Sequence, residues 1–288
     1  MVNSKYKDRL FSYIFGREEN KEWTLSLYNA VNGSSYDNPD DIEINTIEEF
    51  LYMKMKNDLS FILHDYLSLY AHQSTFNPNM PVRELMYVGH IFDKYIKSSS
   101  FSLYGERIIP IPVPKLVVFY NGLKDKEDEV VLELKDAFPD YIDPNQSDIQ
   151  VRVRMLNINY GHNRKLMEAC KPLMEYSWFV ERIRAEKGKG VVLEDAVNIA
   201  LEQMPKDFLI KDCLVNNKAE VVSMCLTEYD EAEEMEKLKN EYLSEGLEKG
   251  MEKGMEKGRE EIITDLLESG KITSAIAEEL RQKYEVNS

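Results

Sequence analysis

The chain has 288 residues, enough for one large domain or two, and its 43% hydrophobic content is typical of a folded protein. No apolar run reaches the ~20 residues of a membrane-spanning helix, and the N-terminus lacks the apolar segment of a signal peptide. Cys170, Cys213 and Cys225 are odd in number and lack metal-site spacing, so we expect reduced thiols in a cytoplasmic protein. We expect no membrane partner, because no apolar run is long enough to span a bilayer.

The net charge of −16 at first argues against nucleic acid as a partner. The acidity is uneven, however. Residues 1–200 contain 24 Lys and Arg against 30 Asp and Glu, whereas residues 201–288 contain 12 against 22. The first part can therefore carry a locally basic DNA-binding face, although no long basic patch is visible in the sequence.

Apolar spacing predicts two helices near the N-terminus, over residues 5–15 and 20–30. Asn20 can cap the second helix, and Gly33 can end it. The acidic residues 36–49 are interpreted as a surface connection that leads to a strand near residues 50–56.

Residues 59–63 and 67–71 alternate in polarity as two strands, and Asp65-Tyr66 between them is short enough for a hairpin turn. Pairing of these strands can bring Asp58 close to the segment from Ala71 to Gln73. A hydrolase gathers carboxylate and amide oxygens around a divalent cation in this way. The alternation also predicts that His72 points to the face opposite Ala71 and Gln73.

A turn at residues 77–81 precedes a predicted helix that runs to about Lys97. Its inward side chains are expected to be Leu85, Val88, Phe92 and Ile96. Arg83 lies elsewhere on this helix and is a candidate for a phosphate contact, with an ordinary surface arginine as the alternative.

Further strands are predicted at residues 115–120, 129–134 and 149–159, followed by a helix over residues 164–185. The run at 115–120 is nearly all apolar, which is typical of a strand buried on both faces. This order of elements predicts an α/β protein with a mixed sheet flanked by helices.

An all-helical C-terminal region is expected after residue 190. Glycines recur every four residues between Gly246 and Gly258, which fits either a close-packed helix pair or a flexible linker. Residues 260–284 predict a helical hairpin broken at Gly270.

Several segments together resemble the recombination-promoting nuclease and putative transposase family of the PD-(D/E)XK nuclease superfamily. The matching segments are residues 7–11, 57–61, 72–81, 118–122 and 156–163. The resemblance implies a restriction-endonuclease-like mixed sheet flanked by helices. We therefore expect a nuclease-like domain at 1–186, a helical extension at 187–232, and a glycine-repeat helix or linker with its hairpin at 233–288.

The resemblance also implies roles for single residues. Asp58 and an acidic residue at position 71 would hold Mg²⁺, for which Mn²⁺ can substitute. Gln73 stands where many relatives carry lysine, and Asp8 matches an acidic residue of the first helix that is a possible auxiliary to the site. Position 71 departs from the pattern, because the chain has Ala71 where the family has glutamate. A single acid-to-alanine change amid intact motifs favours an introduced substitution over a natural loss.

The family function is metal-dependent DNA endonuclease activity, linked to recombination or to phage defence, and Ala71 is expected to impair it in this chain. The alternative is a catalytically silent DNA-binding or regulatory protein that oligomerises through its helical tail. In both cases residues 233–288 are expected to form a homodimer or to contact a helical protein partner, because the apolar stripe of the hairpin is too short to bury itself.

Overall fold

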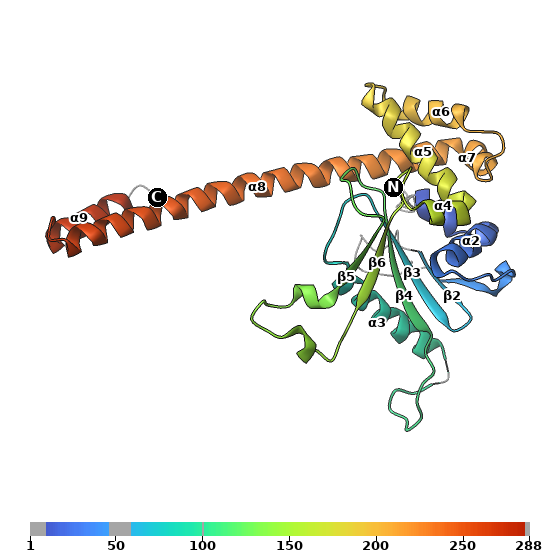
Figure 1. Ribbon diagram of the computed structural model, residues 1–288, viewed down its shortest axis with the longest axis horizontal. Helices are drawn as coiled ribbons and strands as arrows, with labels where there is room; N and C mark the ends of the chain where they lie inside the picture. The colour runs from blue at the N-terminus through green and yellow to red at the C-terminus, as the bar shows by residue number, and fades with distance from the viewer. Residues whose placement is uncertain (1–9, 46–58, 100, 286–288) are drawn as a thin grey trace, which may run out of the picture. The chain divides into compact units, whose positions relative to one another are not determined.

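The computed structural model describes residues 10–45, 59–99 and 101–285 (Figure 1). The chain divides into two compact units, residues 1–230 and residues 231–288. The predicted strand near residues 50–56, together with Asp8 and Asp58, lies outside the described residues. The remaining predictions can be compared with the structure element by element.

The described part of the first unit is built on a six-stranded mixed sheet with the order β1-β2-β3-β4-β6-β5. The strands are β1 (Ile42–Asn45), β2 (Leu59–Leu63), β3 (Tyr66–Gln73), β4 (Val113–Tyr120), β5 (Glu129–Glu133) and β6 (Arg152–Asn157). The pairs β3–β4 and β4–β6 are parallel, and the other three pairs are antiparallel. The prediction of a mixed α/β sheet is therefore confirmed.

The strands β2 and β3 form the predicted hairpin, with a register that runs from Leu63 opposite Tyr66 to Leu59 opposite Tyr70. Its turn consists of His64 and Asp65, not of Asp65 and Tyr66 as the alternation suggested. His64 adopts a φ of 52°, and positive φ is the conformation that two-residue hairpin turns use. Tyr66 can therefore join β3.

The strand β1 replaces part of the predicted surface connection at residues 36–49. Ile42 and Ile44 alternate with Glu43 and Asn45, and Ile42 is fully buried. A pattern of only four residues inside an acidic segment is too short to stand out from the sequence, whereas pairing with β2 satisfies its backbone groups.

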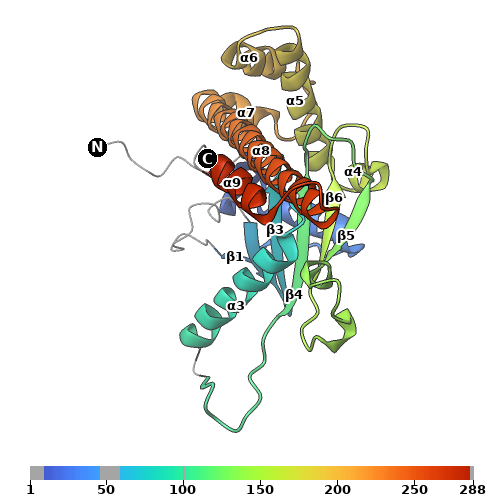
Figure 2. The ribbon, with the colours of Figure 1, turned by 90° about the vertical axis from the view of Figure 1, so that its left-hand side faces the viewer.

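Helices cover the sheet on both faces. They are α1 (Leu10–Phe15), α2 (Lys21–Asn32), α3 (Met80–Ser98), α4 (Arg164–Ala169), α5 (Lys171–Gly188), α6 (Leu193–Gln203) and α7 (Lys211–Asn216). The main core joins α1, α2, α4 and α5 to side chains such as Phe61, Tyr70 and Phe119. The helix α3 packs on the opposite face, in clusters with Leu69 and Ala71, and Figure 2 shows it on its own side of the strands.

The single helix predicted at residues 164–185 is two helices. Its break lies at Cys170, which has an extended backbone with φ −128° and ψ 91°. Pro172 follows in the first turn of α5, where its missing N–H costs nothing.

The inward face of α3 differs from the predicted one. Its buried side chains include Met80, Glu84, Tyr87, Val88 and Ile91, whereas Leu85 and Phe92 are only half-buried. The helix is thus rotated by part of a turn, because Met80 at its start is fixed in the cluster that contains Ala71. A glutamate consequently faces the sheet.

The helices after residue 190 share the core of the first unit. Leu193, Val197 and Leu201 of α6, Leu214 of α7, and Val221 at the start of α8 (Lys218–Glu268) belong to the cluster that covers the sheet. This segment therefore buries its apolar residues against the rest of the first unit.

The second unit contains the end of α8 and α9 (Ser274–Glu285), which form the predicted helical hairpin (Figure 1). Gly270 makes the break with a φ of 67°, in the left-handed region that glycine adopts without strain. Ile263 and Ala277 are buried between the two helices, and an ion pair joins Arg281 to Glu260. The glycine repeat lies within the helical span of α8, so the structure favours a helix over a flexible linker there.

In the part of the chain that the structure describes, no helix is long and apolar enough to cross a membrane.

Candidate functional site

The predicted site residues of β3, Ala71 and Gln73, lie on the same face of the sheet, as the strand alternation predicts. Ala71 is fully buried on the α3 side, in a cluster with Met80, Val118 and Tyr120. Gln73 shares this face, because its Nε2 donates a hydrogen bond to Sδ of Met80. The end of β3 and the start of α3 are thereby joined.

His72 points the other way. Its Nε2 lies 2.9 Å from Oη of Tyr176 in α5, and its ring stacks on Phe11 of α1 with 5.2 Å between centroids. The side chain is 1% exposed. His72 therefore belongs to the main core and does not share the face of Ala71 and Gln73.

Asp58 and Asp8 lie outside the described residues, so the structure does not place either of them. The register of the hairpin ends at Leu59 opposite Tyr70, and these are the chain neighbours of Asp58 and Ala71. The described part of the hairpin thus has the antiparallel pairing on which the predicted site depends.

Arg83 is half-buried on α3. Its Nε and Nη2 donate to Oη of Tyr87, at 3.2 and 2.9 Å, and its Nη1 donates to Sδ of Met80 at 3.3 Å. The guanidinium is thus placed beside the residue that binds Gln73. A cation at this position can balance negative charge on the α3 face.

Glu84 is a residue of this face that the sequence interpretation missed. It is 1% exposed and lies one turn after Met80. Its signal in the sequence is its spacing, four residues from Met80 and four from Val88, which places a carboxylate in an otherwise apolar row.

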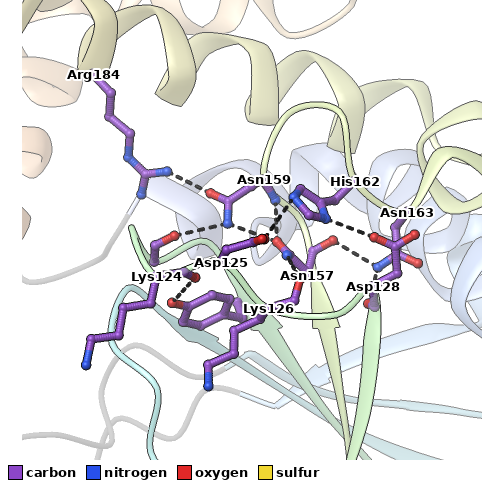
Figure 3. A network of polar contacts seen from close by, with 11 residues as sticks. Lys124, Asp125, Lys126, Asp128, Asn157, Asn159, His162, Asn163 and Arg184 are labelled. Atoms are coloured by element: carbon purple, nitrogen blue, oxygen red, sulfur yellow. Dashed lines mark hydrogen bonds and ion pairs between the residues drawn. The ribbon is translucent and has the colours of Figure 1, made fainter. Parts of the chain in front are cut away.

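Two of the segments on which the family resemblance rests, residues 118–122 and 156–163, are neighbours in the fold. The segments lie side by side at the carboxyl ends of β4 and β6, where asparagines bind the backbone (Figure 3). Asn157 Nδ2 donates to the carbonyl oxygen of Lys126 at 2.7 Å. Asn163 Nδ2 donates to the carbonyl oxygens of Asn157, at 2.9 Å, and of Asp128. These bonds fix the loop between β4 and β5.

Asn159 and Arg184 extend this network to α5 (Figure 3). Asn159 Nδ2 donates to the carbonyl oxygen of Gly122 at 3.0 Å, while its Oδ1 accepts from Arg184 Nη1 at 2.8 Å. Arg184 Nη2 also donates to the carbonyl oxygen of Asn121. The ends of β4, β6 and α5 are therefore held in one arrangement.

The ring of His162 contacts two carboxylates of the same loop, those of Asp128 and Asp125. Its Nδ1 lies 2.9 Å from Oδ1 of Asp128, and its Nε2 lies 3.7 Å from Oδ1 of Asp125. The hydrogen bond with His162 lowers the pKa of the Asp128 carboxyl below its ordinary value, and a backbone N–H of Asn163 adds to the effect. Asp128 is thus held as a carboxylate at neutral pH.

The β4–β5 loop lies directly beside the end of β3. A Cβ atom at Gly122 would overlap the carbonyl oxygen of Ser74, so the backbones approach closely at this point. Nζ of Lys126 lies 4.2 Å from the ring centroid of Phe76. The lysine is therefore next to the segment that follows Gln73.

Gln73 and Glu84 place an amide and a carboxylate among the side chains of the α3 face. Both are hard ligands of the kind that Mg²⁺ binds. Among the described residues, no group of three or more His, Cys, Asp or Glu side chains could hold a metal ion.

Comparisons with models of known protein families, with curated proteins and with solved structures found no match to this chain.

Proposed function

We propose that this chain is a Mg²⁺-dependent DNA endonuclease with a restriction-endonuclease-like core, in which β3 has lost one carboxylate at Ala71. The observation that carries the proposal is the arrangement of β2, β3, α3 and β4. An antiparallel hairpin leads into α3, and β4 returns parallel to β3. The candidate residues Ala71 and Gln73 lie on the face that α3 covers.

A bound Mg²⁺ would lower the pKa of a water ligand and neutralise charge on a phosphate. In this proposal Asp58 holds the metal, and Gln73 orients a water or phosphate oxygen by hydrogen bonding. An amide supplies no positive charge, which a lysine at this position would. Arg83 is the nearby cation that can stabilise the phosphate.

Two lysines near the end of β3 favour the proposal that the substrate is an anion such as DNA. Lys124 is exposed and Lys126 is half-buried, and both belong to the loop that lies beside the end of β3. Lysines beside the site can bind phosphates on either side of the scissile bond, and such contacts carry much of the affinity for DNA.

A catalytically silent DNA-binding or regulatory protein is the second candidate. The observation that favours it is Ala71, which is fully buried among apolar neighbours and offers no oxygen to a metal. The two candidates differ in whether a carboxylate returned to position 71 produces cleavage.

We also propose that the second unit pairs with a second copy of the chain. Leu243, Leu247, Met251 and Met255 are each more than half exposed and form a row along α8 at a spacing of four residues. The glycines of the repeat form the neighbouring row. Rows spaced by four residues pack as ridges into grooves, so this surface is complementary to itself, as a two-fold dimer requires. Two subunits would also provide one site for each DNA strand.

The test is incubation of supercoiled plasmid DNA with the full chain and with Ala71→Glu, in Mg²⁺ and in Mn²⁺. Cleavage by Ala71→Glu that disappears on chelation of the metal supports the endonuclease. If neither protein cuts DNA with either metal, the endonuclease proposal is wrong, and DNA binding measured on the same proteins then decides for or against the silent alternative.

A further inference from the structure

Side-chain donors hold the loop between β4 and β5 along its length. Four of its carbonyl oxygens, spaced two residues apart, each accept a hydrogen bond from a tyrosine of β4 or from an asparagine near the end of β6. The carbonyl oxygens are those of Gly122, Lys124, Lys126 and Asp128, and the donors are Asn159, Tyr120, Asn157 and Asn163, in that order. A backbone that is anchored so often has little freedom, so the loop presents its exposed side chains in fixed positions.

The charged side chains of this loop point to different sides. Asp125 and Asp128 lie on the side of His162, whose ring contacts both carboxylates. The amines of Lys124 and Lys126 point away from His162 (Figure 3). The two lysine amines are thereby kept apart from these two carboxylates.

Arg184 of α5 adds a third cation to the network. Its guanidinium is half-buried and donates only to neutral oxygens, namely Oδ1 of Asn159 at 2.8 Å and the carbonyl oxygen of Asn121. Arg154 and Arg164, by contrast, each bind a carboxylate. A guanidinium has five N–H donors, so Arg184 retains three for a ligand.

In the part of the chain that the structure describes, Lys124 and Lys126 form no ion pair with a carboxylate either. Lys124 is exposed, and Nζ of Lys126 lies over the ring of Phe76. Neighbouring cations repel one another unless an anion lies beside them. The three cations without carboxylate partners therefore favour an anionic ligand at this edge of the sheet.

The three cations are spread along the ends of the strands. Lys126 is beside Phe76, which follows β3, whereas Arg184 reaches the segments that follow β4 and β6. Figure 3 shows the guanidinium of Arg184 apart from the two lysine amines. A small anion needs donors that converge on one point, whereas a nucleic acid strand offers a separate phosphate to each cation. The spread therefore favours an extended polyanion.

We propose that Arg184, Lys124 and Lys126 bind backbone phosphates of DNA, so that the DNA passes over the carboxyl ends of β4 and β6, from the end of β3 to α5. The inference rests on the proposed DNA substrate and deepens it, because it adds Arg184 and the path of the DNA. Phosphate contacts position a duplex without reading its bases, so binding by this edge is independent of sequence.

The experiment measures the affinity of the full chain for a labelled DNA duplex by fluorescence anisotropy at several NaCl concentrations. EDTA is present, so that binding is measured without cleavage. The logarithm of the affinity falls with the logarithm of the salt concentration, with a slope of about 0.9 for each phosphate contact. We expect Arg184→Gln to reduce the slope by about 1, and Lys124→Gln/Lys126→Gln by about 2.

The matched control is Arg164→Gln. It changes the total charge of the chain as Arg184→Gln does, but Arg164 already pairs with Glu168. Its slope is expected to equal that of the original chain. A general effect of net charge on DNA binding would instead reduce the slope in both arginine variants, and this result would overturn the inference.

Two further variants keep the test decisive if Arg184→Gln folds poorly. Lys124→Gln changes an exposed side chain in a loop that is held through its carbonyl oxygens, and a slope reduced by about 1 is expected. Arg184→Lys keeps the charge and loses the planar fork, and its slope is expected to match that of the original chain. A slope that falls in Arg184→Lys as it does in Arg184→Gln would overturn the phosphate contact of Arg184, since the residue would then act only by positioning the loop.

The outcomes separate this inference from the proposed function. Unchanged slopes in the lysine variants would overturn the inference even if Ala71→Glu cuts DNA, and so would absence of DNA binding by the original chain. Reduced slopes without cleavage by Ala71→Glu would support the binding path, while the endonuclease itself fails. If inorganic phosphate displaces the DNA more strongly than NaCl of equal ionic strength, the site holds a single small anion and the proposed path of the DNA is wrong.

Discussion

Gln73, the last residue of β3, donates a hydrogen bond from Nε2 to Sδ of Met80, the first residue of α3. The two residues are separated by a turn of the chain, and their contact fixes how α3 begins. Met80 in turn lies in the cluster of Ala71. The rotation of α3, and with it the inward position of Glu84, therefore follows from how the end of β3 is packed.

The first prediction concerns position 71. We expect the chain to cut supercoiled DNA slowly and only with Mg²⁺ or Mn²⁺, and Ala71→Glu to cut at least about tenfold faster, because changes near a metal alter activity by about 10–100-fold even when they spare its ligands. Plasmid nicking on agarose gels measures both rates. Adding Asp58→Ala to Ala71→Glu should abolish the gain. Efficient cleavage by the unaltered chain, equal to that of Ala71→Glu, would contradict the prediction.

The second prediction concerns the contact between the ends of β3 and β4. Gly122→Ala should lower the free energy of unfolding by about 1–3 kcal/mol, because the added methyl group would overlap the carbonyl oxygen of Ser74. Chemical denaturation followed by circular dichroism measures the change. Gly188→Ala is the matched control, since a Cβ there meets no atom within 4 Å and alanine is the better helix former. If Gly188→Ala loses as much stability as Gly122→Ala, the overlap with the carbonyl oxygen of Ser74 is not the cause of the loss.

The third prediction concerns pH. Arg154 donates to both carboxylate oxygens of Glu129, at 2.8 and 3.2 Å, and this contact lowers the pKa of the Glu129 carboxyl. A carboxyl with a lowered folded pKa stabilises the fold above its unfolded pKa, and the contribution disappears as the pH falls through the folded pKa. Glu129→Gln should therefore cost up to about 1 kcal/mol at pH 7, as for a partly exposed ion pair, and nothing below the folded pKa.

The measurement is urea denaturation of both proteins at neutral pH and in acid. A difference in unfolding free energy between them that persists in acid would mean that the ion pair is not its source.

The fourth prediction concerns the second unit. We expect the full chain to be a dimer by light scattering, and Leu247→Glu/Met251→Glu to be a monomer, because the charges would lie in the exposed apolar row of α8. Lys253→Gln/Lys257→Gln alters exposed residues of the same helix without touching that row and should remain dimeric. A chain that ends at Tyr229 should be monomeric as well. If the full chain is a monomer, the proposal that the second unit pairs with a second copy is wrong.

The sequence by itself determined the elements whose pattern is local and long. The β2–β3 hairpin, the buried strand β4 and the C-terminal helical hairpin follow from alternation, from a continuous apolar run, and from the left-handed glycine at position 270. The opposite orientations of His72 and Ala71 follow from the period of a strand alone. These features depend on residues close together in the chain, so their signals are visible without the fold.

Only the tertiary structure decided which face of α3 turns inward, because that depends on contacts between distant elements. Apolar spacing favours Leu85 and Phe92, but the packing of Met80 against the sheet selects the row that contains Glu84. The same holds for Arg184, which reaches Asn121 and Asn159 from α5. Helical periodicity fixes the spacing of side chains around a helix, whereas the packed neighbours set its rotation, and so the burial of Glu84 follows only from the fold.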